Sequence, residues 1–359
     1  MKLIFKGPIN STSLGNVSVN ILKELFALDF EVSLFPTQDL IDTSVFETDK
    51  SFQDWLEQSY ENRFISCEKN TPTLQVWHIK NSGERLSDKS FLYTFHETDS
   101  VTLSEKKICE THDKVFFSSS FSNKNFTASG ASNTKFIPLG FDKSFSTLKN
   151  PSKLEGQTHF SLMGKMEKRK HTLEIIKNWV KIFGNDPAYQ LSCLITNKFI
   201  PNNIINQSIA SALNGEFYEN VNFLPFLNTN KEVNEFINSV DIDLTGLSGG
   251  EGWNLPAFNS AAIGKTCCVL NATSHADWAT EENSVLVQPK HKVKSHDGVF
   301  FIEGAEFNQG NFFGFTEDCF QKSVIKSLAR HKQGNESGKQ LQTEFTYKKT
   351  VDKILSEIF

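Results

Sequence analysis

A run of basic side chains follows Gly164. Lys165, Lys168, Arg169 and Lys170 lie within six residues, where a predicted strand gives way to a predicted helix. Cations gathered at such a position can surround a diphosphate and neutralise the negative charge that develops when a phosphate group departs. The same run could instead be a solvated basic loop, which is the usual place for clustered charges.

A single carboxylate stands in a glycine-rich turn, residues 248–254, which reads SGGEGWN. This carboxylate, Glu251, is expected to be exposed to a cleft, where it could accept hydrogen bonds from sugar hydroxyls. Pro256 suits the first position of the small-residue helix predicted over 257–263, because its missing N–H would be unpaired there anyway. The N-terminus of that helix could hold a phosphate. Alternatively, Glu251 only complements the helix dipole in an ordinary loop-helix-strand unit.

His96 stands at the end of an apolar strand and is followed by Glu97 and Asp99. A histidine there can orient a hydroxyl or act as an acid or base, and it could instead be a capped loop histidine. His275, with Asp277 and Trp278, follows the strand predicted over 266–270. No metal-ligand spacing connects the histidines, so the sequence predicts no metal site.

The hydrophobic pattern predicts elements that would bring these groups to the carboxyl ends of parallel strands. Residues 3–5, 14–28 and 31–35 are predicted to form a strand, a helix and a strand, a unit typical of a parallel sheet. Gly15 lies near the start of this helix, where open α/β sheets bind ligands. A polar linker is predicted at 146–157, after which the pattern restarts. The segment 37–70 is too polar for an assignment.

Composition excludes several classes of protein. The 359 residues carry a formal net charge of −5, so the surface as a whole does not favour nucleic acid or anionic lipid. The six cysteines form no C-x-x-C pair, which favours a reduced, cytoplasmic protein. No segment approaches the roughly 20 apolar residues of a membrane span, so no transmembrane segment is predicted.

Taken in order, five short motifs resemble those of the retaining glycosyltransferases of family 4. Lys165 and Lys170 stand where that family has the Arg and Lys of G-R-x(4)-K-G. The other four segments are FHETD (95–99), IPLGFD (137–142), EGWNLP (251–256) and ENSVLV (282–287), the last three being similar to the family's I-P-N-G-V-D, E-G-F-G-L-P and E-N-G-x-L-V. The order and spacing of the motifs fit along most of the chain.

The resemblance implies the GT-B fold, in which two Rossmann-like parallel-sheet domains face each other across a cleft. The expected divisions are an acceptor domain at 1–150, a nucleotide-sugar domain at 151–335, and a C-terminal helix at 336–359 that crosses back to the first domain. The implied donor is a nucleotide-diphosphate sugar, the acceptor is a hydroxyl group on a carbohydrate, a lipid-linked or another molecule, and no metal or other cofactor is expected.

The resemblance also implies roles for individual residues. Catalysis is expected from Glu251 on the donor-sugar hydroxyls, from Lys165 and Lys170 on the leaving phosphate, and from His96, which would face the donor sugar. Residues expected to bind the nucleotide sugar are Gly15, Gly164, Arg169, Gly252, Trp253, Asn254, Leu255 and Asn259.

Three residues depart from the family pattern. The second of the family's paired glutamates falls on Asn259, which can accept a hydrogen bond but lacks the strength of a charged acceptor. Lys165 replaces an arginine and so offers a point charge rather than a bidentate fork. His171 replaces the glycine after Lys170. The departure at Asn259 leaves open a non-catalytic GT-B binding protein. A separate alternative concerns the acceptor: an enzyme that glycosylates hydroxylated bases in phage-type DNA, which the acidic net charge disfavours.

Overall fold

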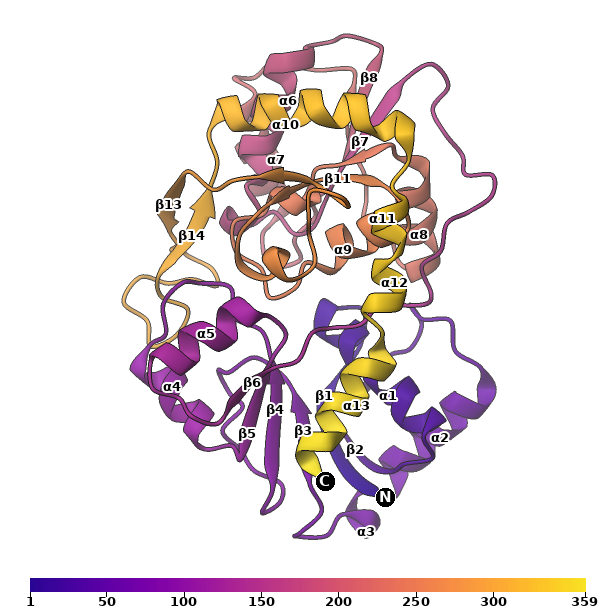
Figure 1. The fold of residues 1–359 in the computed structure, drawn as a ribbon, viewed down its shortest axis with the longest axis vertical. Coiled ribbons are helices and arrows are strands. Elements are labelled where there is room, and N and C mark those ends of the chain that lie inside the picture. Colours follow the sequence, from indigo (N-terminus) through magenta and orange to yellow (C-terminus); the bar gives the residue numbers. More distant parts are fainter.

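The computed structural model describes residues 1–359 as two α/β domains, which lie one above the other in Figure 1. Each domain is built on one six-stranded sheet in which all neighbouring strands run parallel. Helices cover both sheets. The fold class predicted from the sequence is therefore confirmed.

The first domain contains the N-terminal half of the chain, and its sheet has the strand order β2-β1-β3-β4-β5-β6. Its elements are β1 (Lys2–Ile9), α1 (Ser13–Ala27), β2 (Glu31–Ile41), α2 (Lys50–Glu61), α3 (Arg63–Ser66), β3 (Thr73–Val76), β4 (Ser90–Thr94), α4 (Leu103–Glu110), β5 (Lys114–Phe117), α5 (Ser120–Ala128) and β6 (Thr134–Phe136). Helix α1 begins where the Thr12 hydroxyl accepts a hydrogen bond from the N–H of Gly15 at 3.2 Å. A Cβ at Gly15 would lie 2.0 Å from the carbonyl oxygen of Asn10, so only glycine fits this turn.

The second domain repeats the strand-helix alternation, and its sheet has the strand order β12-β11-β10-β7-β8-β9. Its elements are β7 (Thr158–Met163), α6 (Thr172–Phe183), β8 (Tyr189–Leu194), α7 (Asn202–Ala212), β9 (Val221–Phe223), α8 (Asn230–Ser239), β10 (Ile242–Asp243), α9 (Leu255–Ala262), β11 (Thr266–Leu270), β12 (Val285–Val287) and α10 (Glu317–Arg330). The segments that follow β3, β4 and β7 meet at one cavity between the domains.

A hairpin interrupts the second domain between β12 and α10. Its antiparallel strands are β13 (His291–Lys294) and β14 (Asn311–Gly314), and a loop of residues 295–310 joins them. In Figure 1 the hairpin lies at the edge of the second domain and its loop extends toward α4 and α5 of the first. The sequence analysis did not predict this element.

The C-terminal segment returns to the first domain. The short helices α11 (Glu336–Lys339) and α12 (Leu341–Glu344) still pack on α9, whereas α13 (Tyr347–Ile358) packs on α1. The crossing lies at an isolated parallel bridge between Phe141 and Thr346, and Glu357 of α13 forms ion pairs with two lysines of the first domain. The structure thus shows the predicted C-terminal helix crossing back.

Three local predictions need correction. The first strand continues through Gly7 and Pro8 to Ile9. The register between β1 and β2 shifts between Gly7 and Ile9, which accommodates Pro8, a residue without an N–H. The unassigned segment 37–70 contains the end of β2 and the helices α2 and α3. The C-terminal helix expected over 336–359 is instead three helices, and it is broken at Phe345, whose extended backbone precedes the Thr346 cap of α13.

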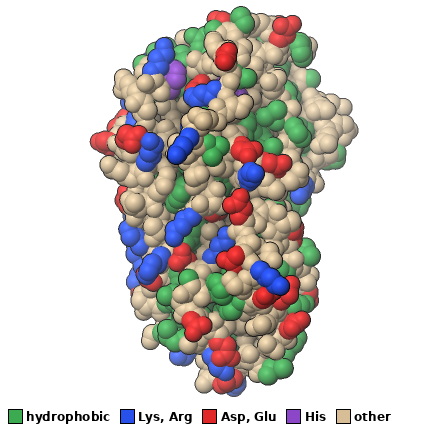
Figure 2. All heavy atoms as spheres, turned by 90° about the vertical axis from the view of Figure 1, so that its right-hand side faces the viewer, with side chains coloured by type: hydrophobic (Ala, Val, Ile, Leu, Met, Phe, Trp, Pro, Cys, Tyr) green, Lys and Arg blue, Asp and Glu red, His purple; other side chains and the backbone are tan.

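Surface charge is mixed on the face that Figure 2 presents, where acidic and basic side chains are interspersed over both domains. None of the helices combines the length and the apolar composition that a bilayer crossing requires.

Candidate active site between the domains

Glu251 is the centre of a buried cluster of charges. Its carboxylate accepts a hydrogen bond from Nη1 of Arg169 at 2.7 Å through one oxygen and pairs with the ammonium group of Lys170 through the other. Only 5% of Glu251 is exposed. The expected open position in a cleft is therefore wrong, because the two neighbouring cations enclose the carboxylate.

The basic run and the glycine-rich turn are joined by several further hydrogen bonds. Arg169 donates from Nε to Glu167 at 2.7 Å and from Nη1 to the carbonyl of Gly250 at 2.9 Å. Its own carbonyl accepts from the N–H of Gly249 at 2.7 Å. These bonds explain why Arg169 points inward, and they hold its guanidinium beside Lys170 rather than in solvent.

Electrostatics keep the cluster charged. Burial alone would raise the pKa of Glu251, but Arg169 and Lys170 outweigh it and lower that pKa to about 2. Burial likewise opposes the charge on Arg169, yet Glu167 and Glu251 hold its pKa above the ordinary value. Two cations therefore balance two carboxylates, so a buried group of four charges has no net charge.

The glycines of the turn allow the two domains to touch. A Cβ at Gly250 would lie 2.8 Å from the carbonyl oxygen of Glu97, and one at Gly252 would lie 2.7 Å from Cβ of Phe95. The carbonyl of Gly252 also accepts a hydrogen bond from the hydroxyl of Ser118 at 2.7 Å. The Glu251 cluster thus lies at the contact with the first domain.

Helix α9 presents its N-terminus just behind Glu251. The N–H groups of residues 252–255 donate to no other group of the protein. Asn254 has a left-handed backbone (φ 68°), and its side-chain amide donates to the Thr245 carbonyl at 3.1 Å and lies 3.0 Å from Nε2 of His275. Four successive free N–H groups at a helix start can bind an anion.

His275 supports this turn and is not available for catalysis. It is fully buried, its Nδ1 lies 2.9 Å from the carbonyl oxygen of Leu270, and burial lowers its pKa to about 4. A neutral imidazole that donates from Nδ1 and accepts from Asn254 satisfies both contacts. His275 therefore has a structural role in this turn.

The remaining predicted binding residues lie at different depths. Trp253 is 2% exposed and packs on Phe258 and Phe345, so only its backbone could reach a ligand. Asn259 is buried in α9, and its Oδ1 has no hydrogen-bond partner. Leu255, the first residue of α9, packs against the apolar core.

Gly164 makes room for the cationic side chain of the Glu251 cluster. It has a φ of +117°, and a Cβ there would lie 3.5 Å from Nζ of Lys170. A residue with a side chain would be strained at this φ and would press on the lysine. The glycine therefore helps to place Lys170 against Glu251.

A cavity of about 470 Å³ lies next to this cluster, between the domains. The first domain contributes residues 77–81, 95–97 and 105, and the second contributes Lys165, Glu167, Arg169 and the hairpin segment 299–308. The cavity brings together Arg169, Lys165 and His96, whereas Glu251 and Lys170 lie outside its lining.

Lys165 is separated from the other cations of its run. Its ammonium nitrogen lies 5.2 Å from the centre of the Phe199 ring and 5.7 Å from that of Phe300, an arrangement typical of cation–π contacts. It forms no ion pair with Glu251. The two cations that contact Glu251 are therefore Arg169 and Lys170.

His96 lines the cavity from the end of β4. It is 2% exposed, and its Nε2 lies 3.5 Å from Oε1 of Glu105 and 3.4 Å from the hydroxyl of Thr98. Its Nδ1 has no partner in the protein. One nitrogen is thus oriented by its neighbours, while the other is buried without a partner in the protein.

Sequence reasoning missed two groups of cavity residues. Glu167 lies inside the basic run, and its pairing with Arg169 could have been suspected from the mixed charges of M-E-K-R-K. Trp77 and the apolar residues of 299–307 carried no motif. The only sequence feature that could have indicated residues 299–307 was the long stretch of chain between the ENSVLV motif and the next helical pattern.

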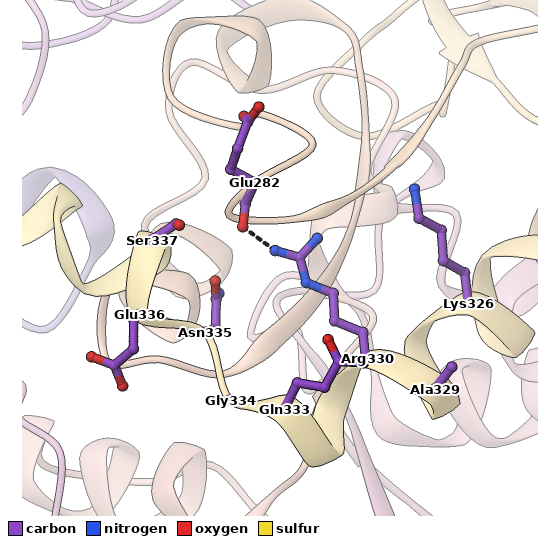
Figure 3. Close-up of a pocket in the computed structure, with 9 residues that line it drawn as sticks. All are labelled: Glu282, Lys326, Ala329, Arg330, Gln333, Gly334, Asn335, Glu336 and Ser337. Carbon is purple, nitrogen blue, oxygen red and sulfur yellow. Dashed lines mark hydrogen bonds between the residues drawn. The ribbon is translucent and has the colours of Figure 1, made fainter.

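The structure brings no three His, Cys, Asp or Glu side chains together in a way that could hold a metal ion. A second hollow, of about 490 Å³, lies at the end of α10 (Figure 3). There the guanidinium of Arg330 donates to the carbonyls of Glu281, Glu282 and Ser284, and Asn335 donates to two further carbonyls. The guanidinium of Arg330 and the amide of Asn335 in this hollow are therefore already bound to backbone carbonyls.

Comparison with known proteins rests on structure. No family model matches the sequence, and no curated protein matches it. Sucrose-phosphate synthase from Thermosynechococcus elongatus matches with a TM-score of 0.69 and 12% identity, over 99% of this chain and 98% of that one. HepE from Anabaena, solved in complex with UDP-glucose, matches with a TM-score of 0.63 and 14% identity, over 99% of this chain and 100% of its own. WaaG, a glycosyltransferase involved in lipopolysaccharide biosynthesis, matches with a TM-score of 0.62 and 11% identity, over 99% of each chain. At such identities the likeness shows the architecture, and the chain has the GT-B fold.

Proposed function

We propose that this protein is a retaining glycosyltransferase of the family 4 type, which moves a sugar from a nucleotide-diphosphate sugar to an acceptor hydroxyl. The observation that carries the proposal is the buried carboxylate of Glu251 between Arg169 and Lys170, directly beside a helix N-terminus with free N–H groups. The match to HepE, which was solved with UDP-glucose, supports a nucleotide-sugar donor.

The cluster is arranged so that a diphosphate can replace a carboxylate. Arg169 and Lys170 already bind one anion, and the N–H groups of residues 252–255 are unpaired. A donor diphosphate would take over the two cations and these N–H groups. Glu251 would then be released from its cations and could accept hydrogen bonds from the hydroxyls of the donor sugar.

During the chemical step, negative charge develops on the leaving diphosphate, which would lie next to Arg169 and Lys170. The acceptor oxygen forms its bond to the anomeric carbon on the face from which the diphosphate departs, and the hydroxyl proton passes to the departing oxygen. Arg169 and Lys170 stabilise the negative charge on the leaving group, and they do so without a metal. His96 faces the sugar from the first domain, and the unpaired Oδ1 of Asn259 is offered to a ribose hydroxyl.

A mass-spectrometric screen tests the proposal. The protein is incubated with a panel of nucleotide sugars in the presence of EDTA, and loss of the sugar from each donor is followed. Lys170→Ala and Arg169→Ala should each lower turnover by at least about a hundredfold, which corresponds to about 3 kcal/mol of lost transition-state stabilisation. Lys181→Ala, which removes a cation from an exposed pair, is the matched control. Undiminished turnover in both active-site variants would refute the assignment.

A second candidate is a binding protein that retains the fold without catalysis. It is favoured by one observation: Glu251 is fully neutralised by its own chain and needs no ligand. Calorimetry with UDP-glucose and the rest of the panel separates the two candidates. A protein that binds a donor but never releases the free nucleotide would support the second.

A further inference from the structure

His171 has a backbone conformation that residues with a side chain rarely adopt. Its φ is 53° and its ψ is 24°, in the left-handed region, between the basic run that ends at Lys170 and helix α6. Glycine, which stands at this position in the family pattern, adopts this region without strain, whereas other residues enter it at a cost. A histidine held here is therefore expected to make a contact that offsets the cost.

The side chain of His171 makes such a contact with the hairpin. Its Nε2 lies 2.8 Å from the carbonyl oxygen of Phe313 in β14, and this nitrogen must carry the hydrogen because a carbonyl oxygen can only accept. The imidazole also lies edge-on to the ring of Phe315, with 5.3 Å between the ring centres. His171 is 7% exposed, so the bond to Phe313 is shielded from water.

Phe313 also binds the glycine-rich turn. Its N–H donates to the carbonyl of Gly249 at 2.9 Å, and the N–H of Gly249 donates to the carbonyl of Arg169 at 2.7 Å. A Cβ at Gly249 would lie 2.0 Å from the Phe313 carbonyl oxygen and 2.5 Å from Nε2 of His171. The hairpin, the turn that carries Glu251 and the basic run therefore meet at one point, and the bond between His171 and Phe313 closes a ring of contacts among them.

Strand β14 also has contacts with the first domain. The ring centre of Phe313 lies 5.8 Å from that of Phe121 in α5. Lys292, which pairs with Phe313 across the hairpin, donates from its ammonium to Asp99 at 2.8 Å. The strand that His171 binds is therefore the strand that joins the glycine-rich turn to the first domain.

We propose that His171 is a positioning residue, which holds β14 against the glycine-rich turn and so fixes the distance between Lys170 and the free N–H groups of residues 252–255. This role rests on the proposed binding of a donor diphosphate, which must contact the lysine and the N–H groups at once. A ligand bound by two groups loses affinity when either group is displaced. His171 itself touches no substrate and acts through Phe313 and Gly249.

Three substitutions of His171 separate its hydrogen bond from its backbone conformation. The amide nitrogen of glutamine can take the place of Nε2, whereas that of asparagine lies nearer the backbone and cannot reach Phe313. Asparagine and glycine, however, suit a left-handed backbone better than glutamine does. The bond therefore favours His171→Gln, and the backbone favours His171→Asn and His171→Gly. The order of the three variants distinguishes a positioning role from a purely conformational one.

The test is a calorimetric titration of the full chain and of each variant with UDP, combined with hydrogen exchange over residues 248–254 and 311–314. His171→Asn and His171→Gly should bind UDP at least about fivefold more weakly than the wild type, and both segments should exchange faster. His171→Gln should bind UDP within about twofold of the wild type. Glu174→Ala is the control, because Glu174 lies 3.3 Å from Nδ1, not Nε2, and its side chain is 40% exposed. It should bind UDP as the wild type does.

Weaker UDP binding by His171→Gln than by His171→Asn and His171→Gly would overturn the inference, as would equal affinity in all three variants. A loss in Glu174→Ala as large as that in His171→Asn would also overturn it, because the effect would then belong to Nδ1. If the wild type does not bind UDP, the donor assignment fails. The exchange rates of the ligand-free proteins still test the bond to Phe313: slower exchange in His171→Gln than in His171→Asn supports it, and the reverse order or equal rates refute it.

Discussion

Two buried glutamates, Glu251 and Glu105, lie on opposite sides of the domain junction and differ in their partners. They are 5% and 1% exposed, respectively. Glu251 pairs with Arg169 and Lys170, two side chains that are positively charged at neutral pH. Glu105 accepts from the backbone of Thr102 and Asn308 and lies close to His96.

This difference in partners means that the Glu251 carboxylate can be exchanged for another anion, whereas Glu105 has a structural role. Another anion can replace the Glu251 carboxylate, because cations in side chains accept any well-placed negative group. The bonds of Glu105 are directed by a helix cap and by the hairpin backbone, where a phosphate has no equivalent position. We infer that Glu251 moves during function and that Glu105 holds the hairpin in place. Four predictions test this contrast.

The largest effect is expected from Glu251→Ala. Loss of the carboxylate leaves the buried ammonium of Lys170 without a partner and leaves Arg169 paired with Glu167 alone, which should lower the free energy of unfolding by about 3–5 kcal/mol. Chemical denaturation measures this change. UDP should restore stability to the variant more than it stabilises the wild type, because its diphosphate would fill the vacated anion position. Equal stabilisation by UDP in both proteins would show that Glu251 does not occupy the diphosphate position.

Acidification should have the next largest effect. The pKa of Glu251 is lowered to about 2 in the folded protein, against 4.5 for the free side chain. The group therefore contributes its stability above pH 4.5 and loses it as the pH falls toward 2, in total about 3 kcal/mol. Between pH 5 and pH 2, the free energy of unfolding should fall less steeply with falling pH in Glu251→Gln than in the wild type. Identical slopes would contradict the assigned pairing.

Glu105→Gln should have an intermediate effect. The amide keeps the shape of the side chain but weakens the bonds to Thr102 and Asn308, so the free energy of unfolding should fall by about 1–3 kcal/mol. Hydrogen exchange should increase over 295–310, while UDP affinity stays within about twofold. A loss of UDP affinity comparable to that of Lys170→Ala would mean that the two glutamates belong to one site.

The smallest effect is expected at an exposed pair. Lys181 and Glu317 form an ion pair with side chains that are 45% and 59% exposed. Lys181→Ala should change the free energy of unfolding by no more than about 1 kcal/mol, because solvent screens such pairs. A thermal melt at low and at high salt checks this. A larger change would show that burial is not what distinguishes Glu251 from the surface pairs.

The sequence predicted the alternation of strands and helices, because buried parallel strands leave a strong apolar pattern, and the resemblance of its motifs to family 4 implied the GT-B architecture. It also placed Glu251, Arg169 and Lys170 in motifs that the structure brings together. It could not show that Glu251 is enclosed, since the pairing joins residues about eighty positions apart in the chain. A local pattern contains no information about such contacts.

The hairpin and the apolar residues that it contributes to the cavity could not be predicted from the sequence, for a related reason. Phe300 and Ile302 belong to no periodic segment, and the strands β13 and β14 are only four residues long. The position of the hairpin depends on Asp99 and Glu105, which lie about two hundred residues earlier in the sequence. Glu97 and Asp99 were noticed as neighbours of His96, but nothing in the sequence connected them to the hairpin.

The chain passes between the domains twice, and the two passages lie side by side. The N–H of Phe141 donates to the carbonyl of Phe345 at 2.8 Å, and a bridge follows at Thr346. A Cβ at Gly140 would collide with the backbone of Tyr347, so the passages are in close contact. Joined in this way, the two passages can bend together, whereas separating the domains elsewhere must break the bonds of the hairpin to Asp99 and Glu105 and the bond between Ser118 and Gly252. In the proposed transferase, we therefore expect the rate of nucleotide exchange to be limited by detachment of the hairpin.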